Sequence, residues 1–190
     1  MRVPVLIAFA CTLSLATNAS AQNTRPLQEL LYADAKVGSL FFTFQFTTSA
    51  GYRITDHHGV GIGYHVENSS SSYSGTDWRG FGLDYRYATD NGFIFKAGGG
   101  LITSAGTYTD SVEDYVHTGG GHFVDFSADY QLRCGMTFGV YFTRAGGMKF
   151  DRYLYDGSYS PENAVYADSS VESMGNLGVS VGFAFPRRGR

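Results

Sequence analysis

Large apolar residues alternate with small or polar residues through most of the chain. From Ser39 to Ile54 the even positions are mainly large and apolar, and the odd positions are mainly Ser, Thr, Gly and Gln. Successive side chains of a β-strand point to opposite faces, so this period of two predicts a strand with two different faces. Further runs with this period cover 60–67, 80–87, 93–101, 123–132, 136–143 and 176–185. A weaker run at Leu31–Val37 predicts an eighth strand.

The less apolar face of these strands holds many glycines and several charged residues in mid-strand. A water-facing strand has little use for repeated glycine, which weakens it. The interior of a narrow barrel, in contrast, needs small residues beside a few long ones. The large apolar face then points outward into lipid. We therefore predict an all-β fold, an eight-stranded antiparallel up-and-down transmembrane β-barrel. We also predict a network of paired charges in its lumen, formed by Asp84, Arg86, Lys96, Asp125 and Asp129.

Short and long connections alternate along the chain. The short ones, at 55–59, 90–92 and 133–135, each end in glycine, which suits the left-handed position of a hairpin turn. The long polar ones lie at about 68–77, 105–120 and 145–174. Bacterial barrels have short periplasmic turns and long external loops, so we expect these three segments to be external. Aromatic residues at the turn-side strand ends predict a periplasmic girdle of Tyr52, Tyr87, Phe93, Tyr130 and Phe185.

The N-terminal segment has the features of a secretory signal. Arg2 gives a positive start, an apolar stretch follows, and Ala19-Ser20-Ala21 provides the small-x-small cleavage pattern. The apolar run is shorter than the ~20 residues of a membrane-spanning helix. We therefore predict a signal peptide at 1–21 and a barrel domain at 22–190. This implies export to the outer membrane. The expected partners are outer-membrane lipids, periplasmic chaperones and the barrel-assembly machinery, and we expect the protein to be a monomer.

Composition and cysteine content exclude several classes of function. The net charge of −3 excludes a nucleic-acid binder that works through a basic face. The two cysteines are too few for a disulfide-rich scaffold or a cysteine-based zinc site, and cleavage after Ala21 leaves only Cys134. His57 and His58 are adjacent in a short turn, where solvation is a simpler explanation than metal binding. We expect no catalytic, cofactor or metal site.

Two stretches carry a resemblance to a known family. The run FQFTTSAGYR at 44–53 and the glycine-alternating GVGIGY at 59–64 resemble the small outer-membrane β-barrel proteins of Bacteroidota. Those proteins are similar in architecture to the OmpA and OmpX barrels. The closing run Leu177–Phe185 resembles the C-terminal strand that barrel-assembly machinery recognises, although that signal usually ends at the phenylalanine and here Pro186–Arg190 follow. The resemblance implies a cell-envelope protein of Gram-negative bacteria.

The expected role is therefore structural or interactive, without enzymatic activity. The external segment 145–174 is rich in Tyr and Asp, which suits contact with an extracellular ligand. A small transport pore is the main alternative, because charges in a lumen also serve selectivity. A lipid A-modifying enzyme has less support: the His-x-Ser pair of lipid A deacylases is missing, while the scattered residues of a palmitoyltransferase leave no spacing to test. A soluble lipocalin-like carrier would require the apolar face to be a core.

Overall fold

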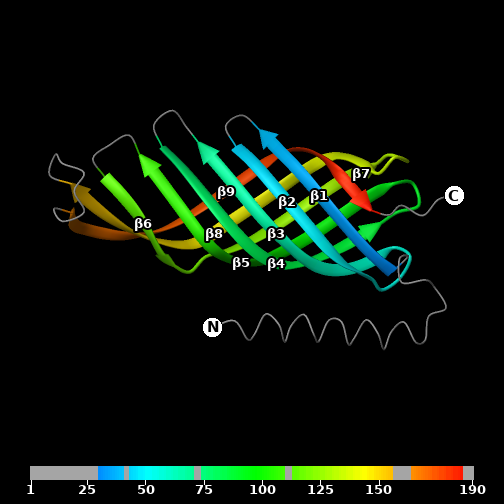
Figure 1. The fold of residues 1–190 in the computed structure, drawn as a ribbon, viewed down its shortest axis with the longest axis horizontal. Helices are drawn as coiled ribbons and strands as arrows, with labels where there is room; N and C mark the ends of the chain where they lie inside the picture. The colour runs from blue at the N-terminus through cyan, green and yellow to red at the C-terminus, as the bar shows by residue number, and fades with distance from the viewer. Residues whose placement is uncertain (1–29, 41–42, 71–73, 110–112, 156–163, 186–190) are drawn as a thin grey trace.

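The fold is described here from a computed structural model of the chain, for residues 30–40, 43–70, 74–109, 113–155 and 164–185. These residues form nine antiparallel strands (Figure 1). The strands are β1 (Leu31–Leu40), β2 (Thr43–Arg53), β3 (His58–Ser70), β4 (Ser74–Ala88), β5 (Phe93–Thr109), β6 (Glu113–Gly119), β7 (His122–Gln131), β8 (Met136–Tyr155) and β9 (Ala164–Phe185). No helix in the described ranges is long and apolar enough to cross a membrane.

The strands close into a ring. Consecutive strands pair from β1 to β5, β8 pairs with β9, and β1 pairs with β9 from Ala33 opposite Phe185 to Ser39 opposite Val179. β6 and β7 both lie between β5 and β8, so they share one position and the described ring has eight strands. β1 begins and β9 ends at the same end of the barrel, at the right in Figure 1. The predicted fold class is confirmed, including the weakly predicted first strand.

Bulges interrupt the wall towards the opposite end. Gly119 ends β6, and Gly120 and Gly121 connect it to β7. These glycines have φ angles of 131°, 77° and 105°, which residues other than glycine rarely adopt. On the neighbouring β8 the register shifts between Ala145 and Met148. Both of these residues are buried although they are three positions apart, which strict alternation forbids. The bulge therefore turns the remainder of β8 so that Met148 points into the barrel.

The outer and inner faces differ as the period of two predicts. Leu83 and Leu101 are 73% and 69% exposed on the outside, whereas Arg86 and Lys96 are only 3% and 7% exposed. An arrangement with leucine outside and charges inside is unfavourable in water and suits a hydrocarbon environment. The apolar band on the outer wall is therefore the membrane-facing surface of this fold.

The predicted bounds of the long connections are wrong. The segments 68–77, 105–120 and 145–174 lie largely in strands, because β3, β4, β5, β8 and β9 continue into them. Backbone hydrogen bonds hold a β-ladder together, so polar side chains do not end it once the strand has left hydrocarbon. The expected left-handed glycine is present at Gly92 and Gly135, with φ of 93° and 94°. It is not at Gly59, which lies within β3. The predicted signal peptide at 1–21 and the tail at 186–190 lie outside the described residues.

Candidate functional site: the barrel interior

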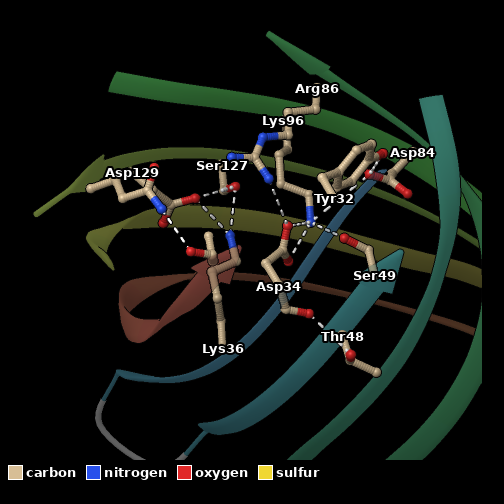
Figure 2. A network of polar contacts seen from close by, with 12 residues as sticks. Tyr32, Asp34, Lys36, Thr48, Ser49, Asp84, Arg86, Lys96, Ser127 and Asp129 are labelled. Atoms are coloured by element: carbon tan, nitrogen blue, oxygen red, sulfur yellow. Dashed lines mark hydrogen bonds and ion pairs between the residues drawn. The ribbon is translucent and has the colours of Figure 1, made fainter. Parts of the chain in front are cut away.

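Asp34 is the centre of a buried polar network (Figure 2). It lies opposite Ala184, near the end of the barrel where β1 begins and β9 ends. The Lys96 ammonium lies 2.8 Å from Asp34 Oδ1 and 3.1 Å from Oδ2, and donates to Ser49 Oγ at 2.7 Å. Arg86 Nη1 is 3.7 Å from Asp34 Oδ2. β1, β2, β4 and β5 thus each contribute a side chain to one cluster. One carboxylate lies between two cations, the arrangement that makes buried charges tolerable.

A second ion pair lies beside the first. Lys36 Nζ is 2.8 Å from Asp129 Oδ2 and donates to Ser127 Oγ, also at 2.8 Å. Asp129 accepts further hydrogen bonds from Ser127 at 3.0 Å and from Ser180 at 3.3 Å. The pair joins β1 to β7 across the lumen, between strands that are not neighbours in the ring.

Tyr32 completes the network on the other side. Its hydroxyl donates to Asp84 Oδ2 at 2.9 Å, and the Arg86 guanidinium carbon lies 5.1 Å from the centre of its ring. Asp84 is also 4.0 Å from Lys96 Nζ. Arg86 and Lys96 are directly opposite in the β4–β5 register, and Asp34 and Asp84 supply the negative charge that two adjacent cations require.

The structure brings together four of the five residues predicted for the lumen: Asp84, Arg86, Lys96 and Asp129. Asp125 is half-buried, and it forms no hydrogen bond or ion pair with any part of the chain that is described. It lines two cavities of about 10 and 30 Å³, the smaller of which suits about one water molecule. Sequence reasoning missed the contribution of β1, namely Tyr32, Asp34 and Lys36. Their alternation with Leu31, Ala33 and Ala35 was the available signal.

Glycines make room for these side chains. A Cβ atom on Gly61 would lie 2.5 Å from the Tyr32 hydroxyl and 2.9 Å from Asp84 Oδ1. A Cβ on Gly139 would likewise lie 2.3 Å from Asp129 Oδ1. Repeated lumen-facing glycine therefore has a packing purpose, as the sequence pattern suggested.

This packing predicts different effects at two neighbouring glycines. Gly61→Ala should lower the free energy of unfolding by roughly 1–3 kcal/mol, because the new methyl group would lie 2.5 Å from both the Tyr32 hydroxyl and the Ala50 carbonyl oxygen. Gly63→Ala is the matched control, since its Cβ would have nothing closer than Thr48 O at 3.8 Å. Its expected effect is within about 0.5 kcal/mol. Urea unfolding in lipid vesicles measures both variants. Equal losses would show that the close contacts with Tyr32 and Ala50 do not limit the size of residue 61.

A second layer closes the opposite half of the interior and consists of apolar side chains. We call it the apolar cluster; its buried members are Trp78, Ile102, Phe123, Ala145, Met148 and Phe150. Trp78, Met148 and Phe150 are 0% exposed. His65 stacks on Trp78, with ring centres 4.9 Å apart and an interplanar angle of 7°.

Glu67 lies at the edge of the apolar cluster. It accepts a hydrogen bond from Trp78 Nε1 at 3.4 Å and another from the Asn176 side-chain amide. His65 instead contacts the Gln45 side chain, so these two lumen residues of β3 have separate partners.

The histidines considered for metal binding and the predicted girdle residues lie towards the short turns. His57 Nδ1 is 2.8 Å from the Ala88 carbonyl, and His58 Nδ1 contacts the Tyr85 hydroxyl. Within the described ranges no group of His, Cys, Asp and Glu has the arrangement of a metal site. The proposed girdle residues Tyr87, Phe93, Tyr130 and Phe185 are exposed and Tyr52 is half-buried; whether they meet a membrane interface stays a prediction.

Comparison with solved structures supports the fold. No family model matches the chain, and no curated protein matches it. Among solved structures it is similar to the outer membrane protein OprG from Pseudomonas aeruginosa, with a TM-score of 0.50 and 14% identity over 83% of this chain and 97% of that one. It also matches Neisserial surface protein A (NspA), with a TM-score of 0.44 and 17% identity over 82% of this chain and 94% of that one. The likeness to OprG supports the fold alone, and the narrower resemblance to Bacteroidota proteins stays a prediction.

Proposed function

We propose that this chain is a non-enzymatic integral protein of the outer membrane with a structural or surface-interaction role. The observation that supports this proposal best is that side chains fill the interior of the barrel. The Asp34 network occupies one half of the lumen, and the apolar cluster occupies the other. The interior of a barrel packed in this way is more similar to a protein core than to a channel, as expected for small eight-stranded barrels.

The architecture supports an orientation in that membrane. The hairpins β2–β3, β4–β5 and β7–β8 have short turns at the end where β1 begins and β9 ends. Short turns face the periplasm in bacterial barrels. At the other end, at the left in Figure 1, the long β8–β9 hairpin extends the barrel wall. In this orientation the hairpin would present a surface to the exterior. Export through the predicted signal peptide and insertion by the barrel-assembly machinery belong to the same proposal.

A narrow pore is the second candidate. The cavities beside Asp125 favour it, because Lys36 and Thr47 also line both of them and such polar walls suit water. The paired charges and the apolar cluster favour a closed lumen.

Conductance in planar bilayers distinguishes the structural role from the pore. We expect no stepwise ion current from the purified protein, because an ion would have to displace salt-bridged residues and then pass buried apolar groups. Discrete openings from folded protein would overturn the structural role in favour of the pore.

Gel mobility with and without boiling is the companion measurement. A folded barrel resists detergent when unboiled and migrates differently from the unfolded chain. A heat-dependent shift with recovery in the outer-membrane fraction is the expected result. Recovery in the soluble periplasm with no shift would overturn the membrane location and favour a lipocalin-like carrier.

A further inference from the structure

A shallow groove of about 420 Å³ lies on the outer wall across β4, β5, β7, β8 and β9. Ala97 and Ala128 are half-buried at its floor, while larger exposed side chains form its sides: Phe95, Phe126, Phe142 and Leu177. The groove belongs to the apolar band that faces hydrocarbon, so an acyl chain suits its lining.

Strand register explains the shape of this groove. Ala97 pairs with Phe126, which pairs with Phe142, which in turn pairs with Leu177. In the adjacent row Phe95 pairs with Ala128. The two alanines are thus diagonal neighbours among larger residues, and the depression runs obliquely over them.

Arg144 lies just beyond one end of the groove, and Lys149 lies farther along the same strand, because the two pair with Gly175 and Val171 of β9. Arg144 is exposed between the buried residues Thr143 and Ala145, so it points outward two residues beyond Phe142. Lys149 is likewise exposed between Met148 and Phe150. Neither cation has a hydrogen-bonding or ion-pair partner among the side chains that the structure describes.

The position of Arg144 along β8 matches a membrane boundary. A tilted transmembrane strand crosses the hydrocarbon in roughly 9–11 residues. Arg144 is the ninth residue of β8 counted from Met136, at the short-turn end. An outward arginine costs about 2–4 kcal/mol at the bilayer midplane and almost nothing at the interface. Arg144 therefore belongs at the headgroup level of the leaflet opposite the short turns.

We propose that the groove and the two cations bind one phosphorylated glycolipid of the outer leaflet. One acyl chain lies over Ala97 and Ala128, and the headgroup phosphates accept hydrogen bonds from Arg144 and, farther along β8, from Lys149. Charge complementarity selects this occupant, because the apolar groove leads to unpaired cations at the membrane surface. The inference rests on the proposed function for the membrane location and the orientation.

Native mass spectrometry of the full-length mature barrel in detergent tests the site directly. The probe is a bisphosphorylated, acylated glucosamine disaccharide, with zwitterionic phosphatidylethanolamine for comparison. We expect one glycolipid per barrel in the unmodified protein and weaker retention of phosphatidylethanolamine. R144Q/K149Q should weaken glycolipid binding roughly tenfold, because two charge-assisted contacts to phosphate are lost. The matched control R133Q alters an exposed arginine at the opposite end and should bind normally.

A second pair of variants tests the groove. A97L/A128L fills the floor with larger side chains that lipid tolerates, and should also reduce binding roughly tenfold. A33L/A35L makes the same change at exposed positions of β1 outside the groove and should leave binding unchanged. Equal glycolipid affinity for the unmodified protein, R144Q/K149Q and A97L/A128L would overturn the site, as would equal affinity for both lipids. Heat-dependent gel mobility is measured on every variant; its loss in the unmodified protein would indicate failure of the membrane role itself, independently of this site.

Discussion

Replacing Lys96 with methionine should lower the free energy of unfolding by about 3–5 kcal/mol, the usual cost of removing one partner from a buried ion pair. Lys96 is the closest cation to Asp34, at 2.8 Å, and it also binds Ser49. Without it, Arg86 at 3.7 Å is the one cation that still forms an ion pair with Asp34 in the described ranges of the chain. Urea titration in phosphatidylcholine vesicles, followed through the fluorescence of the single tryptophan, measures the loss.

Two further variants determine the origin of that loss. Lys149→Met removes an exposed lysine from β8 and should change stability by about 0.5 kcal/mol or less, since no glycolipid is present in these vesicles. The double variant D34N/K96M removes both charges of the pair, so it should be more stable than K96M by about 1 kcal/mol or more. A K96M protein as stable as K149M would show that the polar network does not contribute to stability.

The strands and their faces could be predicted because the geometry of a β-strand leaves little choice. Alternation fixes which residues share a face, and the short turn at 90–92 fixes the register that places Arg86 opposite Lys96. The partners of these cations could not be predicted in the same way. Lys36 and Asp129 are 93 residues apart and meet across the lumen, which depends on how the ring closes between β1 and β9.

The apolar cluster was missed for a different reason. Met148 and Phe150 lie in a segment predicted to be an external loop, and they reach the interior because β8 bulges after Ala145. A bulge reverses the alternation on which the prediction depends, and one sequence does not reveal which glycines form one. The extended hairpin of β8 and β9 mixes polar residues with exposed apolar ones such as Leu154, Val165 and Val171, so no regular hydrophobic periodicity showed that the ladder continues.

Trp78→Ala should be the most destabilising single truncation in the apolar cluster, with an expected loss of about 3–5 kcal/mol. Trp78 is fully buried, stacks on His65, lies 5.2 Å from the ring centre of Phe123 and donates to Glu67. Its removal leaves a cavity and takes a hydrogen bond from a buried carboxyl group. Because this variant contains no tryptophan, the folded fraction is read from gel mobility across a urea series.

Trp78→Phe separates packing from hydrogen bonding. Phenylalanine keeps an aromatic ring beside His65 and loses only part of the volume and the Nε1 donor, so the expected loss is about 1–2 kcal/mol. Hydrogen exchange should also show faster opening around Met148 and Phe150 in W78A than near Lys96, since the first two share the cluster with Trp78. Equal losses in W78A and W78F would contradict this account, because the ring would then contribute little and the contact with Glu67 would carry the effect. Uniformly faster exchange would mean that the two layers unfold as one unit.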